Sequence, residues 1–179
     1  ENEMTAFLIP NGGFPIEGTI GSSGEVVHFH VIKYDSCTQL ALLIGVTKKI
    51  SPEIHIAQWD SRIGADVSTV GNPLGRGLLY NEATVSGRRS MVLTCQTFNH
   101  KPASFNTYSG GTIGGQTGSP LFNSNGRIVG LLVAVATTPI EVYDEEGNQI
   151  GITYIPISHM GYFVPSSFIR TFIRKAPLI

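Results

Sequence analysis

Apolar side chains in this chain gather into short runs, separated by polar and glycine-rich stretches. Residues 26–34 are rich in β-branched and aromatic side chains, and residues 40–46 form a continuous apolar run typical of a buried strand. Residues 140–143 and 149–155 predict a hairpin that turns at the polar residues 144–148. The remaining strand candidates are residues 66–71, 83–87, 91–95 and 128–135.

Only one segment has the spacing of a helix. Directly after Pro165, apolar residues recur three and four positions apart from Phe168 to Ile173. Ser166 or Ser167 is expected to cap this helix at its N-terminus. Many short strands with a single terminal helix favour an all-β fold, either an antiparallel two-barrel fold or a sandwich.

Composition supports this interpretation and limits the classes of partner that the chain is expected to bind. Charged residues make up 14% of the 179 residues, below the ~25% of typical soluble domains, while 21 glycines and 10 prolines suit many turns. The net charge of −1 predicts no nucleic-acid partner and no anionic membrane partner. No apolar run approaches the ~18 residues of a membrane span, and no signal peptide is visible, which leaves the compartment open.

The two cysteines, Cys37 and Cys95, are a thin basis for a disulfide framework. We therefore expect free, buried thiols, with a disulfide between the two as the alternative. Cys95 lacks the glycine-flanked turn and the partner of a cysteine nucleophile, so a core thiol is its expected role.

The most informative stretch is GGQTGSPLF at residues 114–122, followed by NGRIVGL at residues 125–131. It resembles the nucleophile loop of trypsin-like serine proteases, in which a serine stands inside Gly-x-Ser-Gly-(Gly/Ser)-Pro ahead of a strand. In this chain Thr117 occupies the serine position.

Further segments resemble the HtrA/Deg branch of that family, in the same order along the chain. Residues 34–43 (YDSCTQLALL) are similar to its YD…DLALL segment, residues 70–75 (VGNPLG) to its glycine–proline stretch, and residues 161–166 (GYFVPS) to its GFAIP segment. The resemblance implies a trypsin-like double antiparallel β-barrel with a C-terminal helix. Residues 1–85 would form the N-terminal barrel, apparently without its first strands, and residues 86–179 the C-terminal barrel with the closing helix.

The resemblance also places the catalytic positions. A triad needs a hydroxyl nucleophile, a histidine base and a carboxylate that orients the histidine. The nucleophile position holds Thr117, the carboxylate position before the buried strand holds Gln39, and the histidine position holds Leu8. An amide at Gln39 cannot stabilise an imidazolium with charge, so all three members are replaced. The oxyanion-hole amides would belong to Gly115 and Thr117, and without a base they would bind a carbonyl or carboxylate instead of cleaving.

Other residues offer weak substitutes for the missing groups. His28 and His30 lie on one face of a strand, where cross-strand pairing is expected before a base or a metal site, since no further metal ligand is evident. Asp35 is expected to cap a turn, and Ser119 to be structural. The histidines expected to be ordinary surface or strand-end residues are His55, His100 and His159.

The sequence therefore predicts a non-catalytic trypsin-like domain that binds a peptide or protein through the former substrate cleft, with β-strand addition as the natural mode. No cofactor or metal is expected, and a homo-oligomer is possible because HtrA relatives commonly form trimers. One alternative is an active endopeptidase that uses Thr117 with a histidine from outside this chain segment. Another is an unrelated β-protein whose glycine-rich loop matches by chance. The acidic residues 144–146 would border the cleft and contact a basic partner, or simply form a solvated turn, which is the favoured interpretation.

Overall fold

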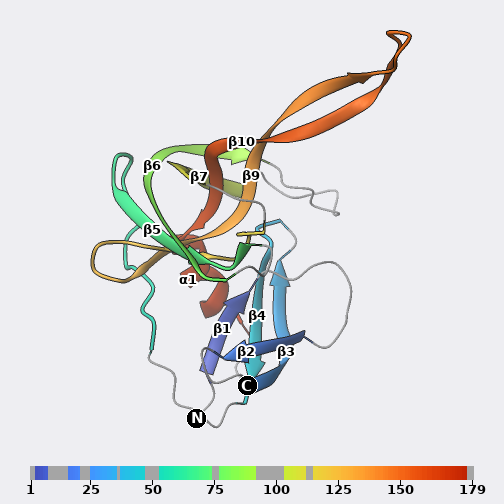
Figure 1. Ribbon diagram of the computed structural model, residues 1–179. Coiled ribbons are helices and arrows are strands. Elements are labelled where there is room, and N and C mark those ends of the chain that lie inside the picture. The colour runs from blue at the N-terminus through green and yellow to red at the C-terminus, as the bar shows by residue number, and fades with distance from the viewer. Residues whose placement is uncertain are drawn as a thin grey trace.

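The computed structural model describes residues 3–7, 16–20, 25–35, 37–46, 53–73, 77–91, 103–111 and 115–176. These residues form a small antiparallel sheet and a closed barrel, with one helix between them (Figure 1). The prediction of an all-β antiparallel fold with a C-terminal helix is confirmed. The elements are β1 (Glu3–Phe7), β2 (Ile16–Ile20), β3 (Glu25–Asp35), β4 (Leu40–Gly45), β5 (Asp66–Gly71), β6 (Leu79–Met91), β7 (Ala103–Gly110), β8 (Pro120–Phe122), β9 (Ile128–Tyr143), β10 (Gln149–Pro165) and α1 (Ser166–Arg174).

The predicted strands agree closely with these bounds. Those at 26–34, 40–46 and 66–71 are confirmed as β3, β4 and β5, to within one residue at each end. The expected strand at 91–95 overlaps β6 only at Met91, and its other residues lie outside the described part of the chain. Runs of β-branched and apolar residues therefore located the strands well, because side-chain packing on a pleated sheet selects those residues.

The N-terminal strands form a four-stranded sheet in the order β1-β4-β3-β2. Strand β4 is central, and its residues Leu40 to Leu43 are at most 2% exposed, as the continuous apolar run predicts. Phe7 on β1 lies opposite Ala41, so the C-terminal end of β1 meets the N-terminal end of β4, next to Gln39.

The remaining strands close into a barrel in the order β10-β7-β6-β5-β8-β9. Along β5, Val67 and Thr69 are buried while Asp66 and Val70 are exposed, the alternation expected of a strand with one face toward a core. The predicted division of the chain after residue 85 lies inside β6. The buried cluster inside the barrel consists of Ala57, Val67, Ala83, Val85, Tyr108, Leu121, Val129, Leu132 and Phe163.

A second buried cluster joins the sheet to the barrel. Leu40 and Leu42 of β4 pack there with barrel residues and with Ile169 and Phe172 of α1. Lys33 of β3 adds a polar link, since its Nζ donates a hydrogen bond to the Phe172 carbonyl at 2.8 Å and lies 4.6 Å from the centre of the Phe172 ring.

Helix α1 is amphipathic as predicted, but the expected serine cap is wrong. Pro165 is the N-cap residue, and no side chain of the cap bonds to the helix. Asp60, from the segment that leads into β5, takes that role instead: it accepts hydrogen bonds from the Ser167 N–H at 2.8 Å and from the Ser167 hydroxyl at 2.7 Å. Ser166 Oγ also donates to Asp60, at 3.0 Å. Because Asp60 is more than a hundred positions away along the chain, a local reading of sequence misses this cap.

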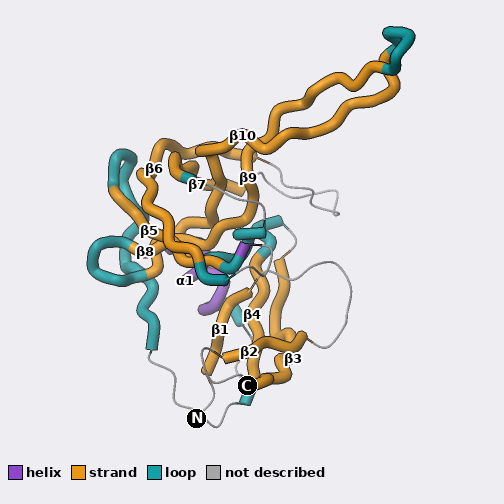
Figure 2. Tube along the Cα trace, viewed as in Figure 1, coloured by secondary structure: helices purple, strands orange, loops and turns teal. Residues whose placement is uncertain are grey.

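The predicted hairpin is confirmed and is longer than expected. Beyond the barrel, β9 and β10 continue together as a two-stranded ribbon that projects from the body (Figures 1 and 2). Asp144 closes its turn by accepting hydrogen bonds from the N–H groups of Asn148 at 2.8 Å and Glu146 at 3.0 Å. Gly147 supplies the left-handed backbone that this turn needs, with φ of 83°.

Cys37 is disulfide-bonded, so the expectation of free thiols is wrong. Cys95, the only other cysteine in the sequence, lies outside the described residues. Two cysteines far apart in sequence carry no information about pairing until the fold brings them together, which is why composition misled here. Among the described residues, no helix has the length and apolar character to cross a membrane.

Candidate functional site

The loop before β8 turns sharply and presents Thr117 outward. Gly115 and Gly118 both have left-handed backbones, with φ of 90° and 89°, which only glycine adopts without strain. The Ser119 N–H closes the turn on the Gln116 carbonyl at 3.0 Å. Gln116 is buried, at 1% exposure, while Thr117 is exposed. The predicted role of these glycines in shaping the loop therefore matches the geometry.

The barrel holds this loop in place. The Gly118 N–H donates to the Leu132 carbonyl at 2.8 Å, and the Leu132 N–H donates to the Ser119 carbonyl at 2.9 Å. Gly71, at the end of β5, packs so closely that a Cβ there would lie 2.5 Å from Ser119 Oγ. Ser119 is buried and structural, as expected.

Gln39 ends the turn that leads into β4. Asp35 Oδ1 accepts a hydrogen bond from the Cys37 N–H at 2.9 Å, which confirms that Asp35 caps this turn. Gln39 is half-buried and has a left-handed backbone, with φ of 56°. Leu8, expected at the histidine position, lies outside the described residues.

The described histidines lie beside carboxylates or are exposed on their strands. The Nδ1 atom of His28 is 3.3 Å from Glu17 Oε1, directly across the β2–β3 pair, which confirms cross-strand pairing. His30 is exposed on the same strand, and His55 Nδ1 lies 3.6 Å from Glu53. His159 sits at the irregular region of β10 near the ribbon, and His100 is outside the described part. Within the described ranges, no imidazole is hydrogen-bonded to Thr117, and no group of three potential metal ligands comes together.

Beside Thr117 the surface is shallow. A depression of about 150 Å³ is lined by Gln116, Thr117, Leu132, Ala134 and Val135, and it has no room for an enclosed water molecule. A deep pocket for a substrate side chain is therefore not preformed at this position by the described residues. The exposed loop and the neighbouring part of β9 offer a contact surface instead.

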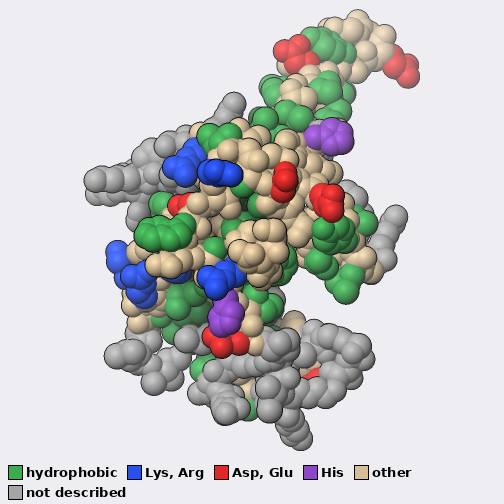
Figure 3. Space-filling view, turned by 90° about the vertical axis from the view of Figure 1, so that its left-hand side faces the viewer, with side chains coloured by type: hydrophobic (Ala, Val, Ile, Leu, Met, Phe, Trp, Pro, Cys, Tyr) green, Lys and Arg blue, Asp and Glu red, His purple; other side chains and the backbone are tan. Residues whose placement is uncertain are grey.

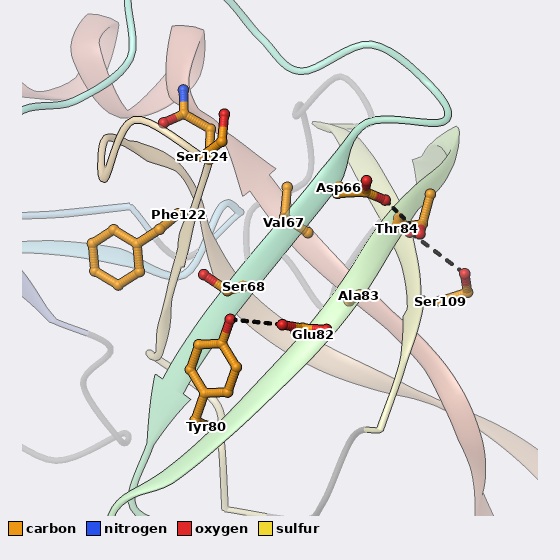
Figure 4. Close-up of a pocket in the computed structure, with 11 residues that line it drawn as sticks. Asp66, Val67, Ser68, Tyr80, Glu82, Ala83, Thr84, Ser109, Phe122 and Ser124 are labelled. Carbon is orange, nitrogen blue, oxygen red and sulfur yellow. Dashed lines mark hydrogen bonds between the residues drawn. The ribbon is translucent and has the colours of Figure 1, made fainter.

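A larger hollow lies on the outer face of the barrel, over β5, β6 and β8 (Figure 4). Its volume is about 480 Å³. Both carboxylates in it are engaged: Glu82 Oε1 accepts from the Tyr80 hydroxyl at 3.1 Å, and Asp66 Oδ1 accepts from Thr84 Oγ1 at 3.3 Å. This groove was not predicted from the sequence. The only local pattern that relates to it is the alternation of outward polar residues along β5 and β6. Its lining residues are Asp66, Val67, Ser68, Tyr80, Glu82, Ala83, Thr84, Ser109, Phe122, Asn123 and Ser124.

Two backbone amides and two neutral side chains are the groups to consider at and near Thr117. In the described part of the chain, the N–H groups of Gly115 and Thr117 have no acceptor, so they are available to a carbonyl or carboxylate of a bound molecule. Thr117 and Gln39, which the family resemblance places at two of the triad positions, carry a hydroxyl and an amide, and neither group is a base at neutral pH.

Comparisons with known proteins agree with this architecture. The family model for the trypsin-like peptidase domain matches residues 13–131. The magnetosome formation protease MamE of Magnetospirillum gryphiswaldense is 28% identical over 165 residues, a match that covers 87% of this chain. The chain spans only 17% of the length of that relative.

Solved structures show the same fold. The active form of the protease Rv3671c of M. tuberculosis has a TM-score of 0.74 at 17% identity, covering 99% of this chain and 70% of that one. The inactive form of Rv3671c has a TM-score of 0.71 at 17% identity, covering 99% of this chain and 79% of that one. The HtrA-type protease AlgW, solved with a decapeptide, has a TM-score of 0.58 at 19% identity, covering 86% of this chain and 43% of that one.

These likenesses confirm the predicted trypsin-like double β-barrel with its C-terminal helix. The family model matches well over half of the chain, from the N-terminal sheet into β9. The chain therefore belongs to the family of trypsin-like peptidase domains.

Proposed function

We propose that this chain is a non-catalytic, HtrA/Deg-like member of the family that binds a peptide or protein through its former substrate cleft. The observation that carries the proposal is Gln39 at the start of β4, where the family resemblance expects the catalytic carboxylate. A carboxylate there holds the histidine in one tautomer and stabilises its positive charge during the reaction. The neutral amide of Gln39 performs only the first of these tasks.

Thr117 supports the same conclusion. Its β-methyl group restricts χ1 and crowds the path that a serine hydroxyl would take toward a carbonyl. An unactivated hydroxyl is a weak nucleophile without an adjacent base. Together with leucine at the expected histidine position, these replacements remove nucleophile activation, acid–base transfer and charge stabilisation at once.

Peptide binding is supported by the backbone near Thr117. Strand β9 pairs with β8 only as far as Leu131, and Leu132 bonds to the loop. From Val133 to Ala136, the described residues leave that edge of β9 without a strand partner, beside the depression that Thr117 lines. An extended peptide would add to such an edge through main-chain hydrogen bonds and reach the free amides of Gly115 and Thr117 with a carbonyl or carboxylate. AlgW, which shares this fold, was itself solved with a decapeptide.

Chemical labelling tests the loss of catalysis. The chain and a Thr117→Ala variant would be treated with a fluorophosphonate probe, beside an active trypsin-family protease, and analysed by mass spectrometry. We expect no adduct at Thr117 and no cleavage of a fluorescent casein substrate by either form. An adduct at Thr117 that the alanine variant lacks would favour the alternative, an endopeptidase whose histidine comes from outside this chain segment.

Binding is tested separately with a library of fluorescein-labelled decapeptides. We expect saturable binding of a subset of peptides, lost in an Ala134→Arg variant because the new side chain fills the depression beside Thr117. Ser124→Arg, a substitution on the outer groove, is the matched control and should bind normally. Equal binding by both variants, or no binding by the parent chain, would contradict the cleft as the binding site.

A further inference from the structure

The groove on the outer face of the barrel, over β5, β6 and β8, is centred on a short side chain (Figure 4). Ser68 of β5 is half-buried, and in the register it lies between Phe122 of β8 and Glu82 of β6. Tyr80 stands beside Glu82, to which its hydroxyl donates a hydrogen bond at 3.1 Å. Because large aromatic side chains lie next to one serine, the face is hollowed by about 480 Å³, within the ~300–1,000 Å³ of small-molecule sites.

The charge of the groove excludes one class of ligand. Its lining carries two carboxylates, those of Asp66 and Glu82, and no lysine, arginine or histidine. Among the described residues, neither carboxylate forms an ion pair. Figure 3 looks at the side of the molecule where β5 lies, and it shows several acidic side chains set in uncharged polar surface. Two uncompensated negative charges repel phosphates and carboxylates, so the groove suits a neutral or a cationic ligand.

Both carboxylates are held in place by hydroxyl groups. Glu82 Oε1 accepts the hydrogen bond from Tyr80, and Asp66 Oδ1 accepts one from Thr84 Oγ1 at 3.3 Å. The second oxygen of each carboxylate receives no hydrogen bond from the described residues. A carboxylate oxygen that is oriented and has free lone pairs is a strong acceptor for a hydroxyl group of a ligand. The groove therefore offers two fixed acceptors.

The groove also offers hydrogen-bond donors. In the described part of the chain, the Ser68 hydroxyl makes no hydrogen bond and is available to a ligand. Asn123 Oδ1 accepts from the N–H groups of Asn125 and Arg127, both at 3.0 Å, which fixes the amide and leaves its NH₂ group as a donor. A cation donates hydrogen bonds but accepts none, whereas a hydroxyl group does both. This mixture of acceptors and donors favours a neutral polyhydroxyl ligand over a cation.

The aromatic side chains add an apolar surface to this polar set. Tyr80 is 58% exposed, so much of its ring is open to a ligand, and Phe122 is half-buried on the neighbouring side of Ser68. A pyranose ring carries hydroxyl groups around its rim and C–H groups on its faces. Such a face packs on an aromatic ring, because the negative π face attracts the C–H hydrogens. A sugar ring therefore matches both the polar and the apolar groups of the groove.

An extended peptide matches this groove less well. Strand β5 pairs with β6 and β8, β6 also pairs with β7, and β8 also pairs with β9, all within the closed barrel. The strands beneath the groove thus have partners on both sides, and they present no edge to the main chain of a peptide. A ligand here is recognised by side chains alone.

We propose that this groove is a binding site for a neutral saccharide. One pyranose unit lies over Ser68 with an apolar face on the Tyr80 ring. Its hydroxyl groups donate hydrogen bonds to Asp66 and Glu82. The groove is open and covers only one side of the ligand, so we expect a dissociation constant of about 0.1–10 mM. The site is separate from the Thr117 cleft, so the proposal stands whether or not that cleft binds peptides.

Saturation-transfer difference NMR tests the site with the neutral trisaccharides maltotriose, cellotriose, mannotriose and N-acetylchitotriose. We expect at least one of them to bind, with an affinity that stays constant between about 0.05 M and 0.5 M NaCl, because a neutral ligand forms no ion pair for salt to screen. Tyr80→Ala removes the ring and should weaken binding about 10-fold. Tyr154→Ala is the matched control, since Tyr154 is 66% exposed but lies on β10, outside the groove, and it should bind like the parent.

A second pair of variants separates this site from the Thr117 cleft. Ser124→Arg places a long side chain in the groove from an exposed position and should abolish saccharide binding. Ala134→Arg, in the depression beside Thr117, should leave saccharide binding unchanged. The expected effects of these two variants on decapeptide binding are the reverse, so failure of one site is distinguished from failure of the other.

Three outcomes would overturn the proposal: no binding of any trisaccharide, equal binding by the parent and the folded groove variants, or loss of binding in Tyr154→Ala. Thermal unfolding followed by circular dichroism shows which variants are folded, and Ser124→Arg, at an exposed position, keeps the test decisive if Tyr80→Ala is not. Binding of spermidine in place of the sugars, lost at about 0.5 M NaCl, would assign the groove to a cationic ligand and reject the saccharide.

Discussion

Two properties of Gln39 are unusual. The family resemblance places it where the catalytic carboxylate is expected, and its backbone is left-handed. Only one other non-glycine residue in the described part of the chain, His159, has a positive φ. Left-handed backbone costs an ordinary L-residue about 1–2 kcal/mol, and aspartate and asparagine tolerate it better than glutamine. The backbone here thus still suits an aspartate, although the side chain is an amide.

This leads to a test of the turn. Gln39→Gly should raise the free energy of unfolding by up to about 1 kcal/mol, because glycine adopts a φ of 56° without steric cost. Gln39→Val should lower it by about 1–2 kcal/mol, since a β-branched residue is poorly tolerated there. Urea unfolding of the three proteins measures both effects. Equal stability of the glycine and valine variants would show that this turn stores no backbone strain.

Close packing at single glycines gives a second prediction at this scale. A Cβ on Gly161 would lie 2.3 Å from the ring of Tyr108, which is completely buried and has no space to move. Gly161→Ala should therefore lower the free energy of unfolding by about 1–3 kcal/mol. Gly111→Ala is the control, because its nearest neighbour would be the Asn81 amide oxygen at 3.8 Å. If chemical denaturation gives the two variants the same midpoint, the barrel is less tightly packed than the contacts indicate.

Among the elements, α1 depends on a carboxylate from outside itself. Burial by itself would raise the pKa of Asp60, but hydrogen bonds from Ser167 and Ser166 and the charge of Arg170 outweigh it and lower the pKa below its ordinary value of 3.8. Arg170 also donates a hydrogen bond to the Ala57 carbonyl, in the segment that carries Asp60. The start of the helix is thus tied to that segment by both charge and hydrogen bonds.

The lowered pKa of Asp60 makes the stability of the fold depend on pH. Because the folded-state pKa is depressed, the ionised group stabilises the fold above pH 3.8, and that contribution is lost as the pH falls below 3.8 through the folded-state pKa. Asp60→Asn should cost about 1 kcal/mol at pH 7, the usual effect of losing a cap. Thermal unfolding at neutral pH and near pH 3 should show the gap between parent and variant closing in acid. A gap of the same size at both pH values would contradict the role of the ionised carboxylate.

At the scale of the whole molecule, the sheet and the barrel share one core. Leu40 and Leu42 of β4 pack in the same cluster as barrel residues and α1. The hydrogen bond and ring contact from Lys33 to Phe172 join the two halves across the edge of that cluster. Because α1 follows the barrel in the sequence but packs against β4 of the sheet, it connects the two halves of the fold.

Lys33→Met tests this connection. Methionine keeps the apolar stem but removes the ammonium group, so the variant should lose about 1–2 kcal/mol of unfolding free energy. Hydrogen exchange should also become faster in α1. Lys175→Met, at the exposed end of the helix, is the matched control and should stay within about 0.5 kcal/mol of the parent. A similar effect in both variants would point to a general loss of charge instead of the Phe172 contact.

Much of the fold was predictable from short-range patterns. The apolar run before Gly45 predicted the buried strand β4, and the polar residues 144–148 predicted the hairpin turn that Asp144 closes. At the candidate site, the glycines around Thr117 predicted the turn of the loop. The cap at Asp60, the disulfide of Cys37 and the groove over β5 and β6 were not predictable, because each depends on residues brought together only by the fold.

By itself, the sequence determined the class of fold, the strand positions and the identity of the residues at Gln39 and Thr117, because alternation, turn residues and motif spacing are local properties of a chain. Only the tertiary structure decided which strands close the barrel, which carboxylate caps α1, and that β9 and β10 leave the barrel as an apolar ribbon. The physical reason is that burial and pairing are properties of neighbours in space. An isoleucine such as Ile152 reads as a core residue in the sequence, and only the fold shows that it faces outward.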